Sequence, residues 1–369
     1  MFWVERDSGL AKEVVDADLD ELLGRDDGWL WLDVAEPTEQ TAELLTTSFA
    51  FHPRAVQSAM ERAHVPRMHG YPDHFMLILH RPLRGEGGHV HYLELDLFVG
   101  PNYLVTVHGP RNPVVPLSAM LTETQEVAKR LSAGRFKATS PVILMGWIIA
   151  TLTAAEETSI NLLAEEVGGL EKRVMAHMDD NKPQAFLDEL FMVRHVLITV
   201  RTMASQSGEI LSRCTRVLKH LPDEDLEVIE DLRDRYRRLD RIATSQLDFL
   251  TGVSDFYRGR TDTRMTIAAE RLAVIAAVTL PITAISSVMG MNVIANENSD
   301  PILLTILLVI MATISIWLLR WARNSRPMLL PTAEGLVTDL RRAGLEVDRA
   351  RRIAPGEPIM AALGRRQPG

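Results

Sequence analysis

Small and hydroxyl-bearing residues recur along one uncharged segment near the C-terminal end of the chain. Thr279, Thr283, Ser286 and Gly290 are spaced four, three and four residues apart, so a helix would place them on one face. Within a membrane, neutral oxygen atoms on that face could accept hydrogen bonds from the water around a cation without removing that water. The same spacing also allows two membrane helices to pack closely. The residues alone leave these two interpretations equally open.

Two long segments contain no charged side chain. Residues 272–296 and 301–319 lack Asp, Glu, Lys and Arg, and each is long enough to cross a hydrocarbon core of about 30 Å as a helix. Proton-coupled carriers generally need an acid or a histidine inside their spans, and these segments have neither. A transported cation would therefore be held by hydroxyls, amides, carbonyls or its own water, which suits Mg²⁺ because this ion dehydrates reluctantly.

Arginines flank the two segments on one side only. The loop 293–301 between them contains neither Lys nor Arg, whereas several arginines precede the first segment and follow the second. These arginines are Arg258, Arg260, Arg264, Arg271, Arg320, Arg323 and Arg326. Because positive charge stays on the cytosolic side, we expect a multi-pass protein of the cell (inner) membrane, with the lipid bilayer as a partner and both termini in the cytosol.

A third apolar run, residues 138–155, is diluted by polar residues. Only 142–150 is fully apolar, which is short for a membrane span. Ser140 and Pro141 are typical of the start of a helix. We therefore predict a buried helix of a folded domain here.

The remaining pattern predicts an α+β domain with a mixed sheet and helices, followed by long helices. Branched and aromatic runs at 30–34, 75–80, 92–99 and 103–108 predict strands. No proline lies between Asp223 and Pro281, so one helix could run from 223 to Met291. We expect three cytosolic parts first: an α/β domain over 1–140, antiparallel helices over 141–222 and a stalk helix over 223–271. The membrane part then follows, with a first transmembrane helix over 272–292, an outer loop over 293–300 and a second transmembrane helix over 301–320. A basic cytosolic tail covers 321–369.

Composition excludes several classes of function. The net charge of −9 argues against nucleic-acid binding, which needs an excess of basic residues. Cys214 is the single cysteine, so neither an internal disulfide nor a thiolate metal cage can form. No nucleophile–base pairing emerges, and we predict no enzyme. Since two helices cannot enclose a water-filled path, transport would require an oligomer with the first span around the axis.

Gly290-Met291-Asn292, at the outer end of the first span, resembles the signature of the CorA family of magnesium channels. Pro281-Ile282-Thr283 is similar to the Pro-x-Thr of that family, and Asp255-Phe256-Tyr257 fits its stalk. The resemblance covers roughly residues 28–326. Departures are Met289 in place of Tyr, Ser287 in place of Gly, and the absence of the usual Asn and Met from 266–270.

The resemblance implies a funnel-shaped homopentamer that moves divalent cations. In such a channel, Asn292 would form a ring that binds hydrated Mg²⁺ at the outer mouth, and Gly290 and Met291 would hold the turn that presents it. The pore-lining positions implied by the resemblance are Leu272, Leu280, Thr283, Ser287 and, lower down, Asp255.

Acidic residues at two further places match the family. Glu297 and Asp300 form a short outer acidic loop. Channels of this family close when cytosolic Mg²⁺ bridges adjacent protomers, and the resemblance implies Asp231 and Glu86 for that role. Carboxylates are suitable ligands for Mg²⁺, although each of these two acids is also explained as a solvated surface residue. Mg²⁺ is thus expected both as transported and as regulatory ion.

The sequence predicts passive, potential-driven influx of hydrated Mg²⁺, with Co²⁺ and Ni²⁺ as further candidates, inhibited by cytosolic Mg²⁺. One alternative is a ZntB-like zinc transporter, although Met291 favours the magnesium channel. Another alternative is a non-conducting, membrane-anchored scaffold or sensor. The basic tail fits either a solvated helix or a segment that docks on anionic lipid or on the acidic stalk.

Overall fold

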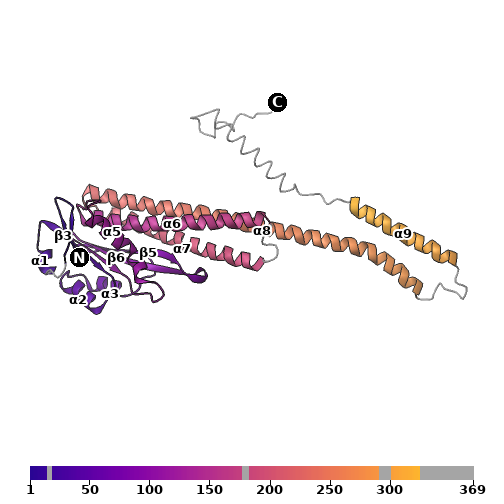
Figure 1. Cartoon of the computed structure of the whole chain (residues 1–369), viewed down its shortest axis with the longest axis horizontal. Coiled ribbons are helices and arrows are strands. Elements are labelled where there is room, and N and C mark those ends of the chain that lie inside the picture. Colours follow the sequence, from indigo (N-terminus) through magenta and orange to yellow (C-terminus); the bar gives the residue numbers. More distant parts are fainter. Residues whose placement is uncertain (15–18, 177–182, 291–300, 325–369) are drawn as a thin grey trace, which may run out of the picture. The chain divides into compact units, whose positions relative to one another are not determined.

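The computed structural model describes residues 1–14, 19–176, 183–290 and 301–324 and divides the chain into two compact units, Met1–Arg260 and Thr261–Gly369. Figure 1 shows the sheet and its surrounding helices in the first unit. Helix α8 (Asp223–Gly290) contributes residues to both units.

The first unit contains a seven-stranded mixed sheet with strand order β2-β1-β3-β7-β6-β5-β4. Only β3 and β7 pair in parallel; the other neighbours are antiparallel. The predicted mixed sheet is confirmed, and the four predicted strands are β3, β5, β6 and β7. The strands are β1 (Phe2–Glu5), β2 (Ala11–Glu13), β3 (Gly28–Val34), β4 (Arg67–Gly70), β5 (Phe75–Arg84), β6 (Val90–Val99) and β7 (Tyr103–His108).

Short helices cover one face of this sheet. An aromatic cluster joins them to the strands, in which Phe51 stacks on Phe98 of β6 with ring centroids 4.5 Å apart. These helices are α1 (Leu19–Leu23), α2 (Glu39–Thr47) and α3 (Pro53–Met60). Two more short helices, α4 (Leu117–Met120) and α5 (Thr122–Ser132), follow β7.

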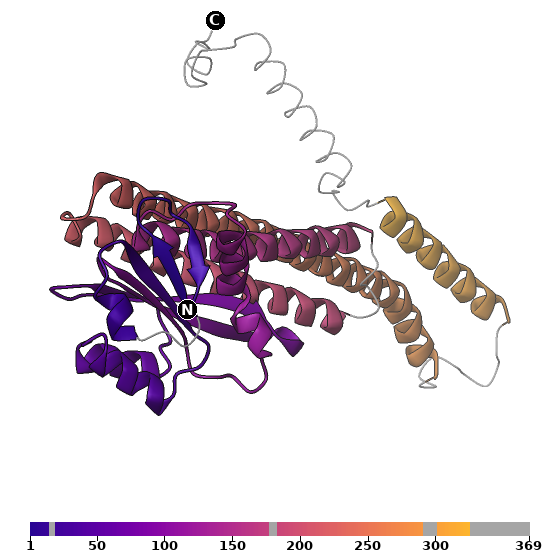
Figure 2. The same ribbon diagram turned by 60° about the vertical axis from the view of Figure 1, so that its left-hand side comes forward.

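Long helices cover the other face. Helices α6 (Pro141–Met175), α7 (Pro183–Val217) and the first part of α8 lie side by side there (Figures 1 and 2). Their buried residues form one core with those of β3, β5, β6 and β7. The Ser140 hydroxyl caps α6 by accepting a hydrogen bond from the Ile143 amide at 3.1 Å. The most apolar stretch of α6 is half buried in this core, so the prediction of a buried domain helix is confirmed.

Helix α8 is the longest element, and it confirms the prediction of a long uninterrupted helix. Its first turn carries Asp223, Glu224 and Asp225, whose negative charges stabilise a helix N-terminus. The helix continues through Pro281, although an internal proline removes one backbone hydrogen bond. Neighbouring groups in a membrane helix can compensate for that loss. Met291, the predicted end of the helix, lies outside the described residues.

Gly146 allows α6 and α8 to approach closely. A Cβ atom at Gly146 would lie 2.4 Å from Val228 Cγ1 of α8, so an added methyl group requires the Val228 side chain or the two helices to shift. We expect Gly146→Ala to destabilise the protein by about 1–3 kcal/mol, the usual range for an overpacked core. The measurement is the thermal unfolding midpoint of the purified protein.

Gly168→Ala, on the same helix, is the matched control. No atom of the described residues lies within 4 Å of a Cβ atom placed there, so alanine should stabilise by about 1 kcal/mol through its higher helix propensity. Shifts of the same sign and size at both glycines would contradict this account of the α6–α8 contact.

Candidate functional site

The uncharged part of α8 exposes apolar side chains that nothing in the described chain covers. None of its most apolar stretch is buried, and Leu272 and Leu280 are 67% and 66% exposed. Leaving a leucine in water rather than burying it costs about 1.5–3 kcal/mol. A helix with this surface therefore requires a cover from outside the described residues, such as lipid or further copies of the chain.

Helix α9 (Pro301–Asn324) has the same character over its described side chains. By length and composition, α6 and α8 are the two described helices able to cross a membrane, and α9 contributes a shorter apolar stretch, Leu308–Trp317. In that stretch Leu308, Val309 and Trp317 are exposed. Of the three helices, α6 differs because the sheet and its neighbouring helices bury it.

Hydroxyl groups of α8 are oriented by the helix backbone. The Thr279 hydroxyl donates to the Ile275 carbonyl at 2.9 Å, and the Thr283 hydroxyl donates to the Thr279 carbonyl at 2.8 Å. Both side chains are exposed. Since each hydroxyl proton is bound to the helix, the oxygen lone pairs are the groups left for outside contacts. The stripe can therefore accept hydrogen bonds from water around a cation.

The structure brings four predicted pore-lining residues onto one face. At about 100° per residue, Leu272, Leu280, Thr283 and Ser287 fall within roughly 80° of the helix circumference, and all four are exposed. This face combines two bulky apolar side chains with two hydroxyls. The lining of a pore by this face stays a prediction.

The predicted outer mouth lies almost entirely outside the described residues. Gly290 ends α8. Met291, Asn292, Glu297 and Asp300 belong to the segment 291–300, which the structure does not describe.

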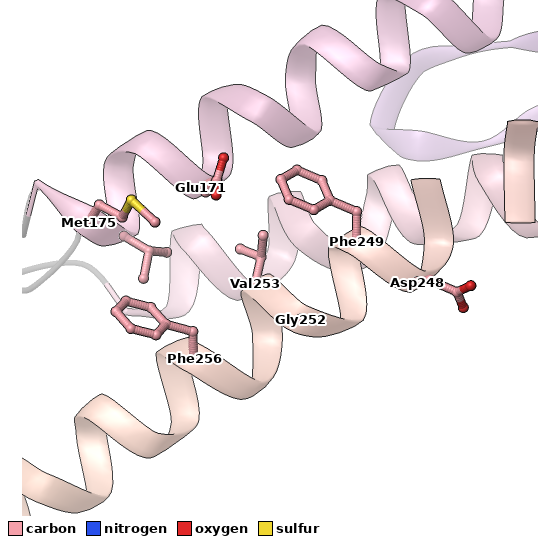
Figure 3. A pocket seen from close by; sticks show the side chains of 8 residues that line it. Glu171, Met175, Asp248, Phe249, Gly252, Val253 and Phe256 are labelled. Atoms are coloured by element: carbon pink, nitrogen blue, oxygen red, sulfur yellow. The ribbon is translucent and has the colours of Figure 1, made fainter. Parts of the chain in front are cut away.

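Asp255 lies on α8 in the first unit, where its side chain is exposed. Next to it an apolar groove separates α6 from α8, with a cavity of about 290 Å³. Figure 3 shows Phe249, Val253 and Phe256 lining this groove from α8 and Met175 lining it from α6. Both phenylalanines are more than 40% exposed, so this part of α8 also presents apolar surface.

The two predicted regulatory acids do not form a metal site within the described chain. Asp231 is 63% exposed and lies 2.8 Å from the Arg235 guanidinium, one turn further along α8. Glu86 is exposed in the short 3-10 helix Glu86–Gly88 that connects β5 to β6. Among the described residues, no group of three or more His, Cys, Asp or Glu could hold a metal. A metal bound at either acid would be held by that carboxylate together with water or with ligands from outside the described residues.

Sequence analysis missed a buried ionisable cluster in the first unit. Arg81 Nε of β5 lies 2.6 Å from the Glu123 carboxylate of α5. Glu156 of α6 and Tyr236 of α8 are fully buried beside this pair. The signal was present, because Glu156 stands four residues after Leu152 and four before Ile160, both of which belong to the buried face of α6.

Burial sets the protonation of this cluster. Burial raises the pKa of the Glu156 carboxyl well above its ordinary value, with the charge of Glu123 adding to the rise and Arg81 opposing it. Burial likewise raises the pKa of Glu123, again opposed by Arg81. Burial therefore favours the protonated form of Glu156 inside the first unit.

The sequence matches a protein-family model and is similar to two named relatives. A model of the CorA-like Mg²⁺ transporter protein family matches residues 26–323. The cobalt/magnesium transport protein CorA of Methanocaldococcus jannaschii is 21% identical over 315 residues, which cover 83% of this chain and 95% of that protein. YfjQ of Bacillus subtilis, whose name refers to metal ion transport, is 24% identical over 273 residues, covering 72% of this chain and 79% of YfjQ.

Solved structures of similar proteins share the fold. The complete structure of the CorA magnesium transporter from Methanocaldococcus jannaschii superposes with a TM-score of 0.72 at 17% identity, covering 88% of this chain and 97% of that chain. The ZntB cytoplasmic domain from Vibrio parahaemolyticus gives a TM-score of 0.55 at 12% identity, covering 71% of this chain and 98% of that domain. Since the family model spans most of the sequence, the protein belongs to the CorA-like Mg²⁺ transporter protein family.

Proposed function

We propose that the protein is a homopentameric channel through which hydrated Mg²⁺ enters the cell passively, driven by the membrane potential. Its family makes it a divalent-cation transporter rather than an enzyme. The observation that carries the finer proposal is the uncharged, unburied part of α8, which leads directly into Gly290-Met291-Asn292.

Assembly follows from the exposed surface of α8. One helix cannot enclose a water-filled path, so the pore requires several copies of α8 around an axis. The face with Leu272, Leu280, Thr283 and Ser287 would line this path, while α9 would meet lipid. Further copies would also cover the apolar groove lined by Phe249 and Phe256. The Asp255 side chains of these copies would form a polar ring below the membrane. The inner-membrane location with both termini in the cytosol rests on the arginine flanks.

The chemistry of this face suits a hydrated ion. Hydroxyl and amide oxygens accept hydrogen bonds from the first water shell, so the ion keeps its water and avoids most of the dehydration cost. The two leucines would form apolar constrictions that close by dewetting. Entry of a divalent cation at 100 mV supplies about 4–5 kcal/mol, so passive transport needs no other energy source. Co²⁺ and Ni²⁺ are further candidate substrates, and cobalt is in the name of the archaeal relative.

Removing the Asn292 amide tests the ion pathway. We expect Asn292→Ala to reduce Mg²⁺ uptake into proteoliposomes by about tenfold or more, since a hydrogen bond that involves a charged partner contributes about 1.5–3 kcal/mol. An Mg²⁺-sensitive dye inside the vesicles measures the uptake. Asn296→Ala is the matched control, because it removes the same amide from the same segment outside the signature.

Three outcomes of this assay would count against the proposal. Equal uptake by both variants and the wild type would mean that Asn292 takes no part in ion passage. Uptake of Zn²⁺ alone, and only with a proton gradient, would favour a ZntB-like carrier. No flux of any divalent cation by the wild type would favour a non-conducting scaffold.

The regulatory role proposed for Asp231, together with Glu86 of a neighbouring copy, can be tested by measuring how internal Mg²⁺ inhibits uptake. The Asp231–Arg235 pair is exposed, and such i,i+4 pairs contribute only about 0.3–0.5 kcal/mol, so a divalent cation can compete for this carboxylate. We expect Asp231→Ala to raise the internal Mg²⁺ concentration needed for half-inhibition of uptake.

Asp234→Ala is the control for charge on the same helix. Asp234 is as exposed as Asp231 and also pairs with an arginine, Arg233, at 3.0 Å. Its removal should leave the inhibition curve unchanged. Identical curves for Asp231→Ala and the wild type would refute the regulatory role of Asp231.

A further inference from the structure

Glu156 lies where five elements of the first unit meet. Its side chain projects from α6 and only 1% of the residue is exposed. The groups around it are Arg81 of β5, Glu123 of α5, Tyr236 of α8 and, nearby on α7, the buried neutral side chain of Ser207. His108 of β7 also interacts electrostatically with Glu123. Helix α8 thus touches an acid that has no access to solvent.

The cation in this cluster is already engaged. Arg81 pairs with Glu123 at 2.6 Å and donates a second hydrogen bond to the Ala119 carbonyl at 2.8 Å. Within the described part of the chain, neither carboxyl oxygen of Glu156 has a hydrogen-bond partner. Two acids therefore share one buried arginine, and Glu123 holds it. An ionised Glu156 would be a buried charge without its own partner, which is strongly unfavourable.

Tyr236 is the residue of α8 that interacts electrostatically with this acid. The Tyr236 ring is completely buried, and its neighbours Ile229, Leu232 and Leu239 anchor the same face of α8 in the core. At Gly208 of α7, a Cβ atom would lie 3.5 Å from Tyr236 Cβ, an ordinary van der Waals distance, so α7 and α8 lie close together at this level. A charge created beside Tyr236 would be unpaired in the dry core, and a local separation of α6 and α8 that admits water would relieve it.

We propose that Glu156 is a proton-dependent switch that couples the pH around the first unit to the packing of α8. With its proton bound, the carboxyl fits the dry junction. With the proton lost at higher pH, the junction opens and the buried stretch of α8 loosens. The link from this loosening to ion transport rests on the proposed function, whereas the switch itself does not.

The direction of the pH response follows from linkage. The raised pKa of Glu156 in the folded protein means that its contribution to stability is complete at low pH and is lost as pH rises through the folded value. Opening of the junction should therefore increase with pH.

Hydrogen exchange of the full-length protein in lipid vesicles tests this switch. We expect the equilibrium constant for local opening, measured at the amides of α8 between 223 and 253, to rise with pH in the wild type. The rise should reach about tenfold per pH unit over the range in which opening releases the proton of Glu156, because one proton is lost for each opening. Glu156→Gln keeps the shape of the protonated acid but cannot ionise, so this added slope should disappear. Comparing both proteins at each pH cancels the intrinsic exchange chemistry.

Glu157→Gln is the matched control on the next residue. Glu157 pairs at the surface with Arg238 at 2.6 Å, so its replacement should retain the wild-type slope. Glu123→Gln gives a second test, because it frees Arg81 to pair with Glu156. An ionised Glu156 would then be tolerated, and the pH response should shrink.

Two results would overturn the switch: equal slopes for Glu156→Gln and the wild type, or loss of the slope in Glu157→Gln. Mg²⁺ uptake by the same vesicles separates this proposal from the proposed function. Exchange that follows the prediction in a protein that conducts no ion would refute the channel and leave the switch intact. Uptake that depends on Asn292, with no effect of Glu156→Gln on exchange, would refute the switch alone.

Discussion

An uncharged helix whose apolar side chains face outward in all directions cannot remain in water, and the other features of the second unit depend on this constraint. The comparison of α6 with α8 illustrates it, because both are long and apolar enough to cross a membrane. Helix α6 lies against the sheet and buries half of its apolar stretch, whereas α8 buries none of its own. At about 1.5–3 kcal/mol for each exposed large side chain, the surface of α8 calls for a cover such as lipid or further copies of the chain.

Helix α8 changes its environment along its length without a break in its backbone. Between Ile229 and Val253, buried residues recur every three or four positions, which is the pattern of a helix with one face in a core. Beyond Val253 none of the described side chains of α8 is buried. Residues near Tyr236 and the hydroxyl stripe therefore belong to one continuous helix.

Sequence patterns predicted the elements that have strong local signals. The strands β3, β5, β6 and β7 are rich in branched and aromatic residues, whereas β2 and β4 are short edge strands with polar residues, and no periodicity distinguishes them from loops. The helix start at Ser140 was predicted because capping depends only on neighbouring residues. The pairing of Asp231 with Arg235 follows the i,i+4 rule and was readable from the sequence.

Glu156 was missed because reading by hydrophobic pattern gives no weight to an acid on an apolar face. The roles proposed for Leu272, Leu280 and Thr283 could not be derived from one chain, since a pore of this kind would depend on other copies.

Most of the proposed ion path runs along an uncharged stretch of α8, whereas the acids Asp231 and Glu156 belong to the first unit, and electrostatics gives a reason for this division. A carboxylate in the membrane span would be costly to hold and would bind a divalent cation too tightly to release it, so neutral oxygens are better placed along the path. Ionisable groups that respond to solution conditions then belong in the first unit, where burial determines which ion each can sense. The exposed Asp231–Arg235 pair is weak and open to solvent, so a metal cation can compete for its carboxylate. The buried Arg81–Glu123 pair admits no hydrated metal, but a proton is small enough to reach Glu156 through transient openings of the fold. Surface acids of α8 are therefore suited to sensing metal ions, and its buried contacts are suited to sensing protons.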